Sequence, residues 1–357
     1  MMASATDFIP HSRPSLGPEE AQAAARVVAS GQLAEGPQTA HFESEFAAFL
    51  GRPHAIAASS GTAALHLVLA AMGIGPGDEV ILPSFVCSAL LNAVNYTGAK
   101  AVLADIEAAT LNMDPLDAAR RLSRRTKALI VPHMFGLPAG LERLLGLEVP
   151  IIEDCAQSVG AFHGSRPLGS WGHAAVFSFY ATKVLAAGEG GMVVTSDREL
   201  ADRVRDLKTY DKRDVYRTRF NYKLTDIQAA VGRIQLGKLP SFIHRRRQIA
   251  RRYHAAFERL PMRPPPDTPE HIYYRFVADV GTDCAAAIRR AGQQGIGCER
   301  PVHTPLHRLL KLEDFSQTDS AWRQCLSIPI YPSLTDSEVE KVIRVISGLL
   351  RGAPDGF

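Results

Sequence analysis

The chain has 357 residues and a mass of 38.8 kDa, a length typical of about two domains. Its 40 lysines and arginines nearly balance its 37 aspartates and glutamates, so the net charge is +3. This balance excludes a protein that mainly coats nucleic acid or a membrane. Hydrophobic residues make up 46% of the chain and charged residues 22%, which excludes wholesale disorder.

The N-terminal helix is predicted by its boundary residues. Pro18 starts the segment, Glu19 and Glu20 follow in the first turn, and Gly31 ends it. A second helix is expected just before Gly51. Short apolar runs then alternate with amphipathic segments, a pattern typical of an α/β fold with a mostly parallel sheet flanked by helices. The strands are expected at residues 54–58, 79–83, 99–105, 127–133, 149–154, 174–180 and 191–196.

The last third of the chain changes character. The arginine-rich run 244–254 is predicted to be a solvated helix face; nucleic-acid binding is the alternative, disfavoured because the basic run is local. Five prolines in residues 261–269 predict a stiff connector. We therefore expect a large α/β domain, residues 1–260, and a small C-terminal α+β domain, residues 261–357, on which the N-terminal segment is a candidate to pack. A strand at 272–280 and helices at 283–291 and 336–350 are expected there.

Five scattered cysteines, none in a CxxC pair, predict neither a disulfide framework nor a metal site. The N-terminus lacks a basic segment followed by an apolar run, and the weakly polar stretch 54–77 is interrupted by polar residues. We therefore expect no signal peptide, no membrane span and a cytoplasmic protein with reduced thiols.

Lys183 lies directly after a run that predicts a buried strand. An amine at such a place is unfavourable unless it is exposed, paired or covalently used. Taken alone, the position favours a lysine that reaches solvent. Ser178 before it and the glycine-rich turn 188–191 after it favour a ligand site instead, because small residues let the backbone approach a ligand closely.

Two further strand ends carry candidate functional groups. Asp154 ends an apolar run, where a carboxylate could face a cofactor and keep a ring nitrogen protonated; a helix N-cap is an equally supported alternative. Gly61 and Thr62 join a strand to a helix, where free amides and a hydroxyl form an anion site or simply a capped helix start. Together with a Schiff-base lysine, these parts are what a protein needs to hold pyridoxal phosphate.

The chain resembles the DegT/DnrJ/EryC1/StrS family of pyridoxal-phosphate-dependent nucleotide-sugar aminotransferases, which have the fold-type I architecture. The resemblance runs from about Arg13 to the last helix and depends on six segments in order. These are residues 30–47, 59–85, 151–161, 177–195, 221–236 and 326–343.

The resemblance implies a role for each matching residue. Lys183 would form the Schiff base with the cofactor and carry protons, and Asp154 would pair with the pyridine nitrogen. Gln157 would lie by the 3′-oxygen of the cofactor ring. The phosphate would be bound by Gly61, Thr62 and Ser178, and by Asn221 from the neighbouring subunit. This last contact implies a homodimer with two shared sites.

The chain departs from the family pattern at two positions. Cys87 occupies the place of the aromatic residue that usually stacks on the pyridine ring, and Phe85 is the nearest candidate to replace it. Lys223 replaces an arginine in the asparagine motif, which removes a bidentate donor. Relatives that have histidine at the position of Lys183 are dehydratases, so its retention favours amino transfer.

The implied reaction is a ping-pong transfer of an amino group from an amino acid, with glutamate as the expected donor, to a keto-sugar nucleotide. The alternatives are a pyridoxal-phosphate-dependent keto-sugar dehydratase or deoxygenase, and a non-catalytic cofactor-binding regulator. Five basic residues are candidates to bind the diphosphate of the sugar nucleotide, and a solvated loop is the alternative. They are Lys208, Lys212, Arg213, Arg217 and Arg219, called the basic group below. His303 and His307 are candidates for the sugar site or for the surface.

Overall fold

The computed structural model describes residues 8–351. Its centre is a seven-stranded sheet in which only β9 runs antiparallel to its neighbours. This confirms the predicted α/β class with a mostly parallel sheet. In spatial order the strands are β1 (His54–Ala58), β9 (Gly191–Thr195), β8 (Ala174–Ser178), β5 (Ile151–Asp154), β4 (Thr126–Pro132), β2 (Glu79–Pro83) and β3 (Lys100–Ala104).

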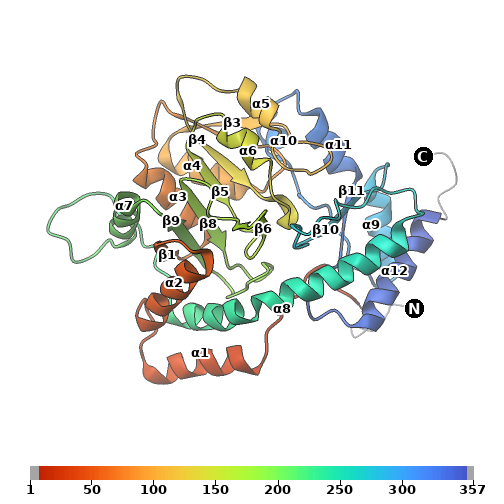
Figure 1. The fold of residues 1–357 in the computed structure, drawn as a ribbon, viewed down its shortest axis with the longest axis horizontal. Helices are drawn as coiled ribbons and strands as arrows, with labels where there is room; N and C mark the ends of the chain where they lie inside the picture. The colour runs from red at the N-terminus through yellow and green to blue at the C-terminus, as the bar shows by residue number, and fades with distance from the viewer. Residues whose placement is uncertain (1–7, 352–357) are drawn as a thin grey trace.

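Helices cover both faces of this sheet (Figure 1). In β1 the alternation of side chains sends Ile56 into one core and Ala57 into the other. The first core is closed by α3 (Gly61–Ala71), α4 (Ser88–Thr97) and α7 (Arg198–Lys208). The second is closed by α2 (Pro37–Leu50) and α8 (Asp226–Phe257), and α1 (Pro18–Ser30) packs on α8. Smaller elements are α5 (Pro115–Arg120), η1 (Met134–Gly136), α6 (Leu141–Leu145), β6 (Phe162–His163) and β7 (Arg166–Pro167).

A separate core is built around the antiparallel pair β10 (Phe276–Asp279) and β11 (Cys325–Ile328). Ile9 near the N-terminus joins this core and bridges Ile296, and α8 adds Tyr253. Because α8 contributes to this core and to that of the sheet, a boundary near residue 260 stays a proposal. The remaining helices of this part are α9 (Cys284–Gln293), α10 (Leu306–Leu310), α11 (Ser316–Gln324) and α12 (Asp336–Arg351).

Strand β10 is shorter than the predicted run 272–280. Residues 272–275 contact the sheet domain instead, where Ile272 N–H donates to the Gly136 carbonyl and Tyr273 has a left-handed φ of 52°. The segment therefore joins the two cores rather than extending the small sheet. In residues 8–351, no helix combines the length and apolarity needed to cross a membrane.

The arginine-rich part of α8 is not the solvated face that its sequence suggests. Arg246 is buried, with Nη1 2.8 Å from the Ile330 carbonyl oxygen and 3.1–3.2 Å from those of Tyr273 and Tyr274. Arg245 bonds the Leu334 carbonyl, which precedes α12. These side chains satisfy buried carbonyls that connect α8 to the C-terminal part of the chain.

We predict that Arg246→Met lowers the free energy of unfolding by about 3 kcal/mol, because three buried carbonyls lose their donor. Urea unfolding of the cofactor-free protein measures this change. Arg251→Met, at an exposed position of the same helix, is the matched control and should cost little. Equal stability of the two variants would contradict the assignment.

Candidate active site

A cavity of about 230 Å³ lies where β5 and β8 end and α3 begins. The carboxyl ends of parallel strands meet at this edge, the usual ligand-binding edge of open α/β sheets. Seven of the nine predicted site residues line it: Gly61, Thr62, Cys87, Asp154, Gln157, Ser178 and Lys183. Tyr180 and Glu189 line it as well and were not predicted.

Lys183 is held in place by the turn that follows β8. Its N–H donates to the Tyr180 carbonyl at 2.8 Å, and Ala181 N–H donates to the Gly188 carbonyl. Gly188 and Gly190 have φ values of 86° and 135°, which favour glycine. The glycine-rich motif thus folds the chain back and aims the half-buried lysine at the cavity.

Asp154 is nine-tenths buried at the end of β5. Burial raises the pKa of its carboxyl, while the Ala156 amide, which donates to Oδ1 at 2.9 Å, and the Lys183 amine oppose that rise. A turn rather than a helix follows at residues 156–160, so the alternative role as a helix N-cap does not apply. The second carboxyl oxygen, Oδ2, has no hydrogen-bond partner in the described chain. It can accept a hydrogen bond from a group bound in the cavity.

The start of α3 forms an anion cradle. Ser60 caps the helix by accepting from Ala63 N–H, which leaves the amides of Gly61 and Thr62 without intrahelical acceptors. A Cβ on Gly61 would lie 2.8 Å from Ser178 Cβ. Only glycine therefore lets the helix start and the Ser178 hydroxyl approach the same point.

We predict that Gly61→Ala weakens the affinity for pyridoxal phosphate about tenfold, because the added methyl group separates the two halves of the cradle. Equilibrium absorbance titration of the cofactor measures the change. Gly237→Ala places a methyl in open space on α8 and is the control. If both variants bind alike, the cradle is not the phosphate site.

Gln157 is fixed by one half of its amide. Its Oε1 accepts from Phe135 N–H at 2.9 Å, so Nε2 remains to donate toward the cavity. A donor at this wall fits the phenolic oxygen of the cofactor. Phe135 has a left-handed φ of 57°, and this unusual backbone conformation aims its N–H at Gln157.

The loop between β2 and α4 carries both residues considered for stacking on the pyridine ring, Cys87 and Phe85. Cys87 is exposed and lines the cavity, whereas Phe85 is fully buried in the core, with its ring centroid 6.5 Å from that of Phe135. Phe85 lies outside the lining and is not placed to cover a ring in the cavity. Phe177 also borders the cavity, but its ring packs against Phe46 in the core on the other face of the sheet. Among the described residues, this leaves Tyr180 as the aromatic side chain at the cavity.

We predict that Cys87→Tyr tightens the binding of pyridoxal phosphate about threefold to tenfold, because an aromatic ring adds a stacking contact. Fluorescence quenching by the cofactor measures the affinity. Ser88→Tyr, at the next position and outside this cavity, should bind like the parent. Weaker binding by Cys87→Tyr would place the cofactor ring elsewhere.

Asn221 and the five residues of the basic group do not line the cavity of their own chain. The connection between α7 and α8, residues 209–225, projects from the body of the molecule (Figure 1). Asp206 pairs there with the three arginines of the group: Arg213, Arg217 and Arg219. Lys208 is buried against Glu35 and Glu43, so this lysine is not available to a diphosphate.

His307 does not line the cavity either. It is buried, with Nδ1 2.7 Å from Ser84 Oγ and Nε2 3.2 Å from Asp319. It therefore attaches the C-terminal segment to the loop after β2. Trp322 donates to the backbone carbonyl of His303, whose side chain is exposed.

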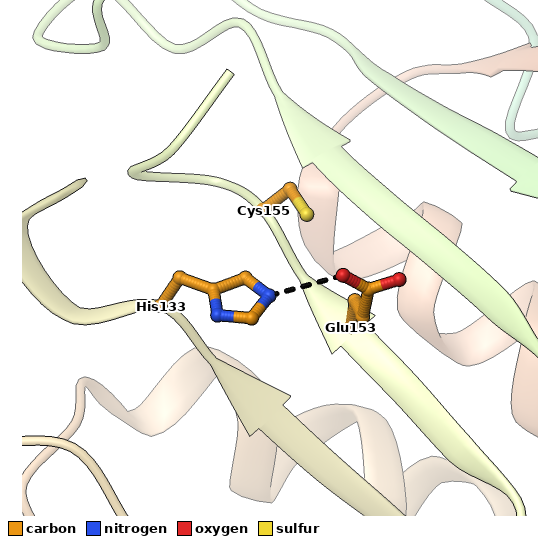
Figure 2. A group of neighbouring side chains, drawn as sticks. All are labelled: His133, Glu153 and Cys155. Atoms are coloured by element: carbon orange, nitrogen blue, oxygen red, sulfur yellow. Dashed lines mark hydrogen bonds and ion pairs between the residues drawn. The ribbon is translucent and has the colours of Figure 1, made fainter. Parts of the chain in front are cut away.

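A buried group of His133, Glu153 and Cys155 lies beside Asp154 (Figure 2), with potential ligand atoms within 4.8 Å of one another. His133 Nδ1 accepts from Ala139 N–H, so Nε2 donates to Glu153 at 3.1 Å. The Glu153 carboxylate also accepts three backbone amides, those of Gly169, Trp171 and Gly172. The ligand atoms of His133 and Glu153 are thus already engaged in hydrogen bonds, and the two residues form a structural network.

The fold and this cavity define a class of protein: an α/β enzyme with a lysine and a carboxylate that face a helix start with free amides. The model of the DegT/DnrJ/EryC1/StrS aminotransferase family matches residues 14–347. The chain belongs to this family, which confirms the family predicted from the sequence. It is a pyridoxal-phosphate-dependent aminotransferase.

Relatives extend over the whole chain. It is 36% identical to the spore coat polysaccharide biosynthesis protein SpsC of Bacillus subtilis (strain 168), across 99% of this chain and 100% of SpsC. The aminotransferase TlmJ of Streptoalloteichus hindustanus is 34% identical, with a TM-score of 0.92 over 96% of this chain and 99% of TlmJ. DesV of S. venezuelae is 35% identical, with a TM-score of 0.88 over 94% of this chain and 95% of DesV.

Proposed function

We propose that this aminotransferase moves an amino group from an amino acid, glutamate in the first instance, to the keto group of a nucleotide-linked sugar. One observation carries the proposal. Lys183 and Asp154 face the same cavity, whose floor is the anion cradle of Gly61 and Thr62. The lysine rather than a histidine at position 183 favours amino transfer over dehydration.

The residues of the cavity fit pyridoxal phosphate. The free amides of Gly61 and Thr62 and the Ser178 hydroxyl would hold its phosphate, and Asp154 would accept from its ring nitrogen. Gln157 Nε2 would donate to the ring oxygen. When bound, the cofactor supplies an aldehyde that condenses with amines and a protonated ring that withdraws electrons.

Lys183 then has two tasks in this chain. Its amine anchors the cofactor, and once released it carries a proton to and from the substrate carbon. The turn at residues 188–191 keeps the amine at the cavity while it is free. Asp154 holds the opposite end of the site at a fixed position, because its own backbone lies inside the sheet.

The substrate class is supported by the relatives and by charge. SpsC is named for polysaccharide biosynthesis, which fits an enzyme that modifies an activated sugar. Lys212 is exposed on the projecting 209–225 connection, with Arg213 and Arg217 nearby. Five basic side chains of residues 209–225 stand against three carboxylates, those of Asp211, Asp214 and the neighbouring Asp206. The connection therefore keeps a net positive charge that suits a diphosphate.

We further propose a homodimer in which the projecting connection reaches the partner's site. Val215 and Tyr216 are 72% and 94% exposed at its tip, and Tyr96 is 59% exposed next to the cavity. Exposed apolar side chains on an extended loop favour contact with another chain. Asn221 on this connection would then complete the partner's phosphate site. The five cysteines are unpaired, which supports a cytoplasmic enzyme.

The test is incubation of the purified enzyme with pyridoxal phosphate, glutamate and a panel of nucleotide-linked keto-sugars, with products identified by mass. We expect one or a few panel members to gain an amino group. Lys183→Ala should reduce product formation to background, because it removes both the anchor and the proton carrier. Unreduced turnover in Lys183→Ala, or dehydrated rather than aminated products, would contradict the proposal.

A further inference from the structure

A buried tyrosine contacts the lysine-bearing turn from outside the cavity. Tyr274 is 6% exposed and lies just before β10. Lys183 Nζ is 5.4 Å from the centroid of its ring. The Tyr274 hydroxyl lies 3.4 Å from Thr182 Oγ1, on the residue directly before Lys183. Tyr274 therefore meets the turn both through its ring face and through its oxygen.

The surroundings of Tyr274 are cationic. The Arg275 guanidinium lies 4.9 Å from the ring centroid, and the buried Arg246 bonds the Tyr274 carbonyl. Burial by itself raises the pKa of a phenol, but Lys183, Arg275 and Arg246, together with the Thr182 hydroxyl, lower the pKa of Tyr274 to about 8. A cluster of three buried or half-buried cations thus favours a negative oxygen at this point.

We propose that Tyr274 is a positioning residue for Lys183: its ring face holds the free amine at the cavity, and its hydroxyl, 3.4 Å from Thr182 Oγ1, fixes the turn that carries the lysine. An ammonium at the edge of a dry cavity is unfavourable without a partner. Asp154 provides one partner at the cavity, and Tyr274 provides the second from behind the turn. The inference depends on the proposed role of Lys183, and it is independent of which sugar is used.

A purely structural tyrosine would behave differently. A ring that only fills the space between the turn and α8 would titrate above an exposed phenol, because burial disfavours the charged form. Neighbouring Tyr273 shows this behaviour, since burial and its hydrogen bond to Asp267 raise the pKa of its phenol. The pH at which Tyr274 ionises therefore separates the two roles without any activity measurement.

The experiment is an ultraviolet absorbance titration of the cofactor-free protein. We expect one of the nine tyrosines to ionise near pH 8, before the exposed phenols do at about pH 10. Tyr274→Phe should remove this early phase, and Tyr273→Phe should leave it in place. The absence of an early phase in the parent protein overturns the proposal.

Substitution of the lysine tests the coupling directly. Lys183→Met should raise the midpoint of the early phase by about one pH unit or more, because it removes the cation whose charge lowers the pKa of this phenol most. Lys183→Arg retains the charge and should keep the midpoint near that of the parent. A midpoint that does not respond to Lys183→Met overturns the proposal, even where Tyr274→Phe fails to fold.

Kinetics complete the test. With pyridoxal phosphate and glutamate, Tyr274→Phe should slow the first half-reaction about tenfold with thermal stability unchanged, while Tyr273→Phe keeps the parent rate. An unaltered half-reaction in a folded Tyr274→Phe protein overturns the positioning role. If the lysine-dependent titration is found but no keto-sugar is aminated, the proposed substrate fails and the link between Tyr274 and Lys183 stands.

Discussion

The active site depends on the fact that β5 and β8 run parallel and end at the same edge of the sheet. Asp154 ends β5 and Ser178 ends β8, and the two strands are paired in register. Asp154 and Ser178, which are more than twenty residues apart in the sequence, thus reach the same cavity through the pairing of their strands alone. The single antiparallel strand, β9, begins at this edge, and directly before it Gly190 bridges Ser60 at the start of α3.

The two adjacent carboxylates at the end of β5 show how strand geometry separates roles. Successive side chains of a strand point to opposite faces, so Glu153 and Asp154 enter different environments. Glu153 is satisfied by His133 and three backbone amides, and these bonds lower the pKa of its carboxyl against the effect of burial. Asp154 has one amide partner and keeps a free oxygen for the cavity. One carboxylate stabilises the fold, and the other is left available for chemistry.

Stability and function are also connected through α8. Arg246 on this helix bonds the carbonyls of Tyr273 and Tyr274, and so fixes the segment that brings Tyr274 against Lys183. The same segment is tied to the sheet domain through Ile272 and Gly136. The C-terminal part of the described chain thus contacts the lysine-bearing turn through Tyr274, although it adds no residue to the lining of the cavity.

The sequence by itself determined the seven strands of the central sheet, most helices, the fold class and seven of the residues that line the cavity, but not β6, β7 or β11. It could do so because these features depend on local patterns: apolar runs, glycine turns and the residue that ends each strand. It did not determine the burial of Arg246, Lys208 and His307, whose partners come from distant segments. Nor could it show that Phe85 packs inward or that Tyr274 meets Lys183. Those contacts join residues that are close only after the sheet and the C-terminal core have packed together, and only the tertiary structure decides them.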